Sequence, residues 1–193
     1  MKNSVLFICL FSIFNLFAQE ESKTVDKHFG AAINSSLMGD LWSFTIAPTG
    51  FFYINKHQIE LGFAFHPFYH SGDRNLGGEL NYKYFPNGID KIFNMYFVTN
   101  FTYTNQYWEK KIPNQSTGIP YSYERNTDFL TLTGGYGFQV KFLKNAYVGT
   151  NFTLGVTTFS RRVDSSTSTS YRIPMFGEYY LDGALRFNVG YRF

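Results

Sequence analysis

The best candidate for an enzymatic site in this sequence is a short segment around residue 70. His66, His70, Ser71, Asp73 and Glu79 all fall within it. A serine nucleophile needs a histidine base, and the imidazole ring needs a carboxylate to orient it. These residue types could therefore serve a hydrolase that cleaves acyl chains.

The spacing of these residues argues against catalysis. His70 and Ser71 are adjacent, so on a β-strand their side chains would point to opposite faces. The run His70-Ser71-Gly72-Asp73 also has the composition of a turn. We therefore predict that the protein is not an enzyme, with an acyl hydrolase kept as an alternative.

The sequence gives no sign of a metal or cofactor site. Of the four histidines only His66 and His70 are close together, and four residues along a strand span about 13 Å. The single cysteine, Cys9, lies in an apolar N-terminal run, so a chain processed after that run has no thiol. We expect no metal, no cofactor and no catalytic residue.

The strongest pattern in the chain is the alternation that ends at Phe193. Counting back by twos gives an apolar set, while the residues between them are small or polar. A period of two places the two sets on opposite faces of a β-strand. The apolar set is Phe193, Tyr191, Val189, Phe187 and Leu185.

Seven earlier segments show the same strand pattern, which makes eight in total. Most are near the roughly 9–11 residues that a tilted membrane strand needs. The eight segments are 29–37, 44–54, 59–65, 76–84, 93–103, 130–142, 146–156 and 180–193.

The connections between these segments alternate in length. Three are short (55–57, 86–91 and 143–145), one is intermediate (70–75), and 106–128 and 160–179 are long and polar. Outer-membrane barrels have short periplasmic turns and longer extracellular loops. Two prolines, Pro48 and Pro67, lack a donor for the hydrogen-bond ladder, so we expect them near the outer rim or at bulges.

The composition favours a barrel in lipid. Aromatic residues make up 21% of the 193-residue chain and charged residues only 16%, against roughly 25% charged in a soluble domain. A soluble lipocalin-like barrel is the alternative, with its apolar face turned inward. The terminal Phe, the aromatic content and the asymmetry of the loops favour the membrane barrel.

The N-terminus has the features of a secretory signal peptide. Lys2 precedes an apolar core that ends near Ala18. We predict a signal peptide at 1–18, a periplasmic segment at 19–28 and a barrel at 29–193, with an uncleaved anchor as the alternative. Without Lys2, 16 basic residues stand against 14 acidic ones, which is too mild an excess to predict a nucleic-acid partner.

The alternating strands and the terminal Phe resemble the OmpA/OmpX-like outer-membrane β-barrel families of Gram-negative bacteria. The resemblance implies an all-β fold, an eight-stranded antiparallel up-and-down transmembrane β-barrel in the bacterial outer membrane. It also implies that the barrel-assembly machinery reads Phe193, together with Tyr191 and Val189. The lipid bilayer and lipopolysaccharide would be its surroundings.

Eight strands enclose a lumen just wide enough for side chains to fill it, so we expect no large pore. Opposite charges in such a lumen should pair. We predict a polar network, in which Glu60 lies almost opposite Lys83; a gated ion path through it is an alternative. The predicted charged members are Glu60, Glu79, Lys83, Lys141, Arg186 and Arg192, and their amide partners are Asn34, Asn81, Asn94, Asn100, Asn151 and Asn188.

Aromatic residues at the strand ends should form girdles at the two membrane interfaces. We expect Trp42, Tyr69, Tyr103 and Tyr107 in the outer girdle, and Tyr53, Tyr84 and Phe193 in the periplasmic one.

The long loops are the expected seat of function. Aromatic and cationic residues in segment 106–128 suit contacts with proteins, glycans or lipid phosphates. These candidate contacts are Tyr107, Trp108, Lys110, Lys111, Tyr121 and Arg125. We predict a structural or surface-interaction role, with two alternatives: a lipid A-modifying enzyme, or the barrel subunit of a larger envelope complex.

Overall fold

A computed structural model describes residues 27–38, 43–67, 74–112, 121–164, 169–171 and 179–193. All of its regular elements are strands, and no helix among these residues has the length and apolar character needed to cross a membrane. The strands are β1 (Lys27–Met38), β2 (Ser43–Ile54), β3 (His57–Phe65), β4 (Arg74–Tyr84), β5 (Phe93–Ile112), β6 (Tyr121–Lys141), β7 (Ala146–Asp164), β8 (Thr169–Tyr171) and β9 (Tyr179–Arg192). The predicted signal peptide lies outside the described residues.

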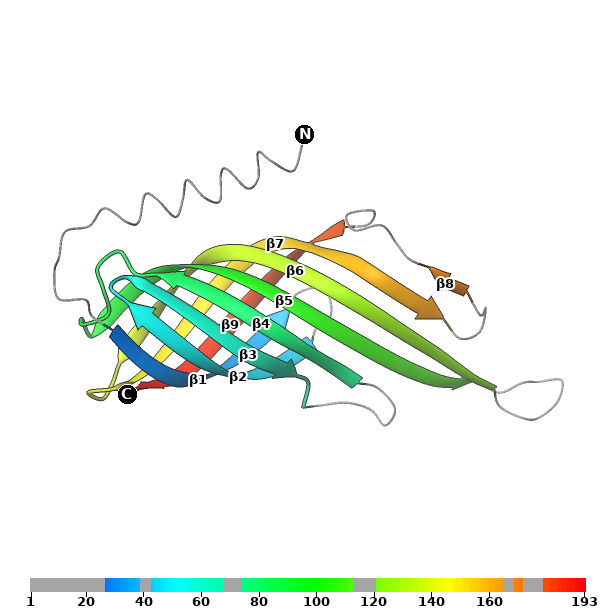
Figure 1. The fold of residues 1–193 in the computed structure, drawn as a ribbon, viewed down its shortest axis with the longest axis horizontal. Coiled ribbons are helices and arrows are strands. Elements are labelled where there is room, and N and C mark those ends of the chain that lie inside the picture. Colours follow the sequence, from blue (N-terminus) through cyan, green and yellow to red (C-terminus); the bar gives the residue numbers. More distant parts are fainter. Residues whose placement is uncertain (1–26, 39–42, 68–73, 113–120, 165–168, 172–178) are drawn as a thin grey trace, which may run out of the picture.

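Eight of the strands close into a barrel. Each of β1 to β7 pairs antiparallel with the next, β7 pairs with β9, and β9 pairs with β1. Short β8 pairs with the outer end of β7, outside the barrel wall (Figure 1). Closure leaves no unpaired edge in the wall, which matters in lipid because an unpaired backbone group there costs several kcal/mol. The predicted eight-stranded up-and-down barrel is confirmed.

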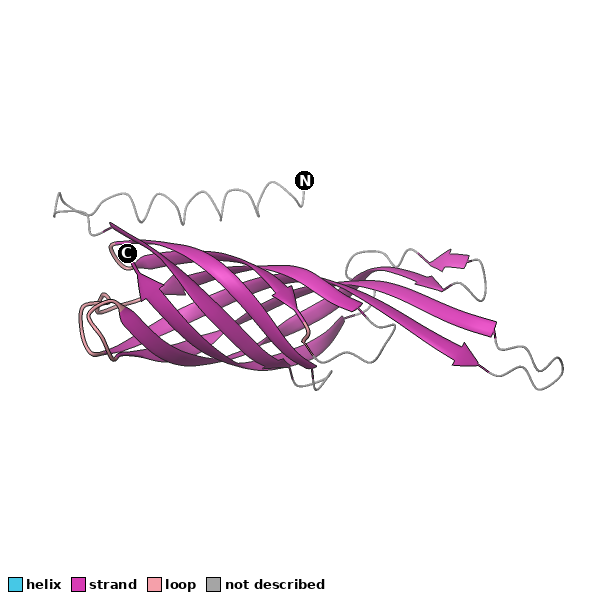
Figure 2. Ribbon diagram, turned by 90° about the horizontal axis from the view of Figure 1, so that it is seen from below, coloured by secondary structure: helices cyan, strands magenta, loops and turns pink. Residues whose placement is uncertain are grey.

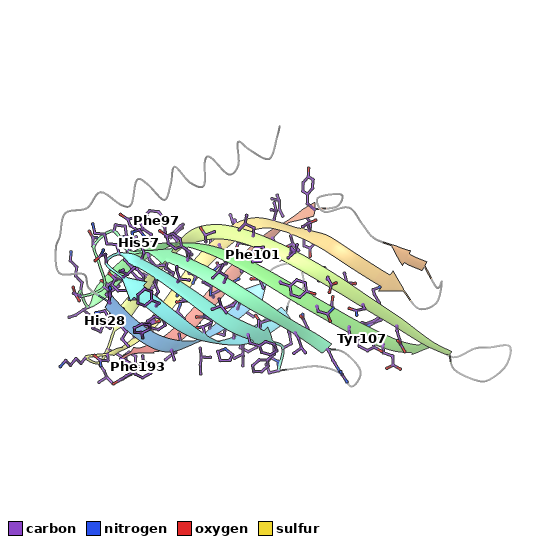
Figure 3. The ribbon with its side chains drawn as sticks, viewed as in Figure 1. His28, His57, Phe97, Phe101, Tyr107 and Phe193 are labelled. Carbon is purple, nitrogen blue, oxygen red and sulfur yellow. The ribbon has the colours of Figure 1, made fainter. Side chains whose placement is uncertain are left out.

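The two faces of the wall differ in polarity as the alternation predicts. On β3, Glu60 is fully buried while its neighbour Leu61 is 68% exposed. Phe97 and Phe101 lie on the outer face of β5 in the same way (Figure 3). Because the large apolar side chains point out and the ionised ones point in, the alternative of a soluble barrel with an apolar interior is wrong.

Three strands are far longer than predicted. β5, β6 and β7 contain 20, 21 and 19 residues, against 9 in β3. The segment 106–128 was predicted as a loop, but β5 and β6 stay paired from Phe93↔Val140 to Ile112↔Tyr121. We call the part of this sheet that lies past the barrel rim, built from β5, β6, β7 and β8, the outer sheet (Figure 2).

Pro48 is neither near the rim nor at a bulge, which corrects the prediction. It lies in the middle of β2, exposed on the outer face and paired with Ile33 of β1. On the other side, the pairing of β2 with β3 skips from Ile46↔Phe65 to Thr49↔Gly62. The missing donor of Pro48 is thus accommodated by a local gap in one ladder.

Candidate functional site

A buried ion pair joins β3 and β4 inside the lumen, toward the end of the barrel that carries the β2–β3 turn. Lys83 Nζ lies 2.5 Å from Glu60 Oε1, and neither side chain is more than 2% exposed. In the strand register Lys83 pairs with Gln58 and Glu60 pairs with Asn81, so the two charges are diagonal neighbours. Gln58 Nε2 also donates to Glu60 Oε1 at 2.6 Å.

A second buried ion pair joins β4 to β9 across the lumen. Arg186 Nη1 lies 3.3 Å from Glu79 Oε2. The amide of Asn34 donates to Glu79 at 2.9 Å and to Glu60 at 3.3 Å. The amide of Asn81 does the same at 2.9 and 3.2 Å. These two amides connect both carboxylates into one unit, which we call the charge network: Glu60, Glu79, Lys83, Arg186, Asn34 and Asn81.

The charge network links four strands of the barrel wall. Two carboxylates face two cations, and each carboxylate also accepts amide hydrogen bonds. Burying a charge is tolerable only when it is paired and hydrogen-bonded in this way. Residues from β1, β3, β4 and β9 are thereby tied together through the middle of the barrel.

Two predicted members of the network lie elsewhere. Lys141 is only partly buried at the end of β6, and within the described residues it makes no ion pair. Arg192 is buried, but its Nη1 donates to the carbonyl of Ile89 at 3.2 Å and its guanidinium lies 5.1 Å from the Tyr147 ring centre.

The other predicted asparagines lie inside the barrel. Asn100 donates to Asn81 at 2.5 Å, and Asn94 donates to the carbonyl of Lys91 at 2.8 Å. Asn151 and Asn188 both donate to the hydroxyl of Tyr96, at 3.3 and 3.4 Å.

Aromatic residues fill the lumen beside the charge network and on its periplasmic side, and the sequence patterns did not predict them there. Tyr53 was predicted for the periplasmic girdle, but it is fully buried inside the barrel with its ring 6.0 Å from that of Phe85. Phe51, Tyr96 and Tyr147 are also inside. The sequence of β2 could have predicted the inward position of Phe51 and Tyr53, because these two residues alternate with the outward residues 52 and 54.

Three of these interior rings lie over glycines of a neighbouring strand. Phe51 covers Gly30, Tyr96 covers Gly137 and Tyr147 covers Gly190. A Cβ atom at any of these glycines would overlap the ring that covers it. Large rings therefore fit a narrow lumen because the wall beside them carries no side chain.

A narrow polar cleft lies on the extracellular side of the charge network. Seven of its fifteen lining residues carry a hydroxyl, and the space between them has room for about two water molecules. Thr157 donates a hydrogen bond to Asp182 at 3.0 Å there. Lining residues include Ser36, Thr45, His66, Thr104, Thr157 and Asp182.

The proposed catalytic cluster is only partly described. His66 lines the polar cleft, and Glu79 is bound to Arg186, Asn34 and Asn81 in the charge network. His70, Ser71 and Asp73 lie outside the described residues. No group of three His, Cys, Asp or Glu side chains within the described ranges is placed to hold a metal ion.

The candidate loop contacts lie in strands, which corrects their assignment to a loop. Trp108 and Arg125 are directly paired across β5 and β6, with the guanidinium 5.8 Å from the indole ring centre. Tyr107 donates a hydrogen bond to Glu124; its pKa is raised by desolvation and then by the carboxylates of Glu124 and Glu109. In the same hairpin, positions 110, 111 and 121 pair with Tyr123, Ser122 and Ile112.

The proposed assembly residues are on the lipid-facing surface. Val189, Tyr191 and Phe193 are all exposed, Phe193 most of all, and its backbone N–H donates to Phe29 at 2.8 Å. Figure 3 shows Phe193, His28 and His57 at one end of the barrel and Tyr107 toward the other. Of the girdle residues, Tyr103 is exposed and Tyr84 half-buried, while Trp42 and Tyr69 lie outside the described residues.

Comparison with known proteins gives matches to solved structures alone. No family model and no curated protein sequence matches the chain. The N-terminal β-barrel domain of Pseudomonas aeruginosa OprF superposes with a TM-score of 0.56 at 9% identity, covering 86% of this chain and 97% of that one. A major outer membrane protein from Thermus thermophilus gives 0.57 at 14% identity, covering 86% and 99%. Neisserial surface protein A gives 0.50 at 9% identity, covering 89% and 100%.

The chain has the fold of the small eight-stranded outer-membrane barrels. The resemblance predicted from the sequence is confirmed at the level of the fold. Its apolar outer wall requires contact with lipid, and together with the fold this places the protein in the bacterial outer membrane, as predicted. The end with the short turns and Phe193 is then the periplasmic end.

Proposed function

We propose that this barrel anchors the outer sheet at the cell surface as a contact surface for other molecules, and that it is not an enzyme. The observation that carries the proposal is the length of β5, β6 and β7. A membrane strand needs roughly 9–11 residues, so the 21 residues of β6 leave about ten more, or roughly 30 Å of strand. Such an extension adds nothing to closure of the barrel in lipid.

The chemistry of the outer sheet supports contacts with polar molecules. The guanidinium of Arg125 lies over the Trp108 ring, and Tyr107 donates a hydrogen bond to Glu124, so these side chains are held in place. Ordered aromatic and guanidinium groups are the side chains most often important at interfaces. We propose lipopolysaccharide headgroups and a surface protein as the partners of this sheet.

Photo-crosslinking from single positions tests the proposal. A photoreactive residue at Glu109 reports on the outer sheet, and one at Leu143, an exposed residue of a periplasmic turn, is the matched control. We expect a crosslinked partner from position 109 in intact cells and none from 143. A fixed protein partner captured from 143 alone would overturn the proposal in favour of a periplasmic envelope complex.

The absence of enzymatic activity is tested by the lipid A of cells that produce the protein. We expect the same acylation pattern, by mass spectrometry, with and without the protein and with the Ser71→Ala variant. An acyl change that appears with the protein and disappears with Ser71→Ala would show an enzyme instead.

A further inference from the structure

The β4–β5 connection, residues 85–92, differs from the other two periplasmic connections. Residues 55–56 form a two-residue turn and 142–145 a short one, whereas 85–92 is longer and folds back into the barrel. Two of its apolar side chains are almost completely buried, Phe85 at 0% and Ile89 at 1% exposed. A connection that merely joined two strands would leave such residues at the surface.

This segment is hydrogen-bonded to several parts of the wall. The bonds reach the β2–β3 turn, β5, β6 and β9, so the segment lies across the barrel opening and is not attached to one side only. The bonds are Phe85 N–H to Lys56 O (2.8 Å), Asn94 Nδ2 to Lys91 O (2.8 Å), Lys141 N–H to Ile92 O (2.8 Å) and Arg192 Nη1 to Ile89 O (3.2 Å).

The buried side chains of the segment form an apolar layer with residues of the wall. Phe85 packs its ring 6.0 Å from Tyr53 and 5.2 Å from Tyr96, and Ile89 and Val98 belong to the same cluster. The charge network adjoins this layer, because Val98 pairs directly with Lys83 in the strand register and Lys83 Nζ lies 5.2 Å from the centre of the Tyr96 ring. An apolar constriction of this kind excludes water and ions.

We infer that residues 85–92 form a seal over the periplasmic end of the lumen. Water and small ions then reach the charge network only from the extracellular side, through the polar cleft. The lumen is therefore open at its extracellular end alone. The barrier at its periplasmic end consists of packed apolar side chains and does not depend on the two ion pairs.

Cysteine reactivity measures the seal directly. Val98 and Thr104 both face inward from β5, Val98 in the apolar layer and Thr104 in the polar cleft. Each is changed separately, Val98→Cys and Thr104→Cys, in a Cys9→Ser background. Outer-membrane vesicles open to reagent on both sides are then treated with a charged, water-soluble thiosulfonate reagent.

With the seal intact, we expect Val98→Cys to react roughly tenfold or more slowly than Thr104→Cys. Equal reaction rates would overturn the inference, and this comparison does not require a destabilised variant.

The second measurement follows the same cysteine reactivity after the seal has been opened by mutation. Phe85→Ala with Ile89→Ser, added to Val98→Cys, should raise its reaction rate to that of Thr104→Cys. Heat-modifiable migration on a denaturing gel shows whether the doubly substituted barrel is still folded. If it is not, the single variant Ile89→Ser is used in place of the double variant. A folded, opened barrel in which the Val98→Cys thiol still reacts slowly would contradict the seal.

Discussion

Lys83 and Glu60 show how much depends on a single buried side chain. Each is almost completely removed from water, and each has the other as its charged partner at 2.5 Å. Removing one partner of such a pair leaves an uncompensated charge, which costs more than the pair itself contributes.

We therefore expect Lys83→Met to lower the free energy of unfolding by about 3–5 kcal/mol. The double variant Lys83→Met with Glu60→Gln should lose less free energy of unfolding than Lys83→Met alone, because no unpaired charge remains in the lumen. Urea unfolding of the refolded protein in detergent micelles measures both.

Lys141→Met is the matched control for this pair. Lys141 is only partly buried, so its loss should change stability by no more than about 0.5 kcal/mol. A Lys83→Met variant as stable as the control would contradict the structural role of the charge network.

Gly190 offers a second test at the residue scale, because the Tyr147 ring occupies the space of its missing side chain. Gly190→Ala should destabilise the barrel by about 1–3 kcal/mol through overpacking. Gly50 faces outward with no atom near its Cβ position, so Gly50→Ala should be neutral or stabilising by up to about 1 kcal/mol. The same unfolding assay compares the two alanines, and equal effects would argue against rings packed on glycine.

Among the elements, the strands inside the membrane could be predicted from the sequence because their two faces meet different surroundings. In β9 one face contacts lipid and the other the lumen, so apolar and polar residues alternate. Past the rim both faces of β5 and β6 meet water, and Tyr107, Trp108 and Glu109 follow one another without a period of two. The hairpin there was predicted as a loop for that reason.

The charge network could be predicted in part from the sequence, whereas the seal could not. Inward charges at alternate positions predicted that Glu60 would lie almost opposite Lys83, although their pairing is diagonal, and Lys141 and Arg192 do not belong to the charge network. Phe85 and Ile89 follow no strand period, since they belong to a connection whose fold depends on contacts with distant strands. Such contacts have no local signature in the sequence.

Phe193 ends the closing strand, and its proposed role in assembly can be separated from a role in stability. Its side chain is 75% exposed, so removing it should leave the unfolding midpoint of the folded barrel almost unchanged. We expect instead that the folded, heat-modifiable form appears more slowly in cells. Leu181→Ala, which removes an equally exposed side chain from the other end of β9, should not slow assembly. Equal assembly rates for both variants would count against a signal at Phe193.

On the scale of the whole molecule, the barrel is layered along its axis. An apolar seal closes the periplasmic end, the charge network crosses the middle, a polar cleft opens outward, and the outer sheet continues from the wall. Such a filled lumen supports the proposed role as an anchor and argues against a diffusion pore.

All of these layers depend on one orientation, in which apolar side chains contact lipid and ionised ones fill the lumen. Tyr96 and Phe97 are adjacent on β5, yet Tyr96 is 2% exposed inside the barrel and Phe97 is 60% exposed outside it. A single tryptophan at either position, in a background where Trp42 and Trp108 are changed to Phe, reports which side meets the acyl chains.

The decisive measurement is quenching of that tryptophan by brominated lipids after the protein is refolded into vesicles. We predict strong quenching for the Phe97→Trp variant and little for Tyr96→Trp, with both variants heat-modifiable. Equal quenching, or stronger quenching at position 96, would contradict this orientation and the layered lumen inferred from it.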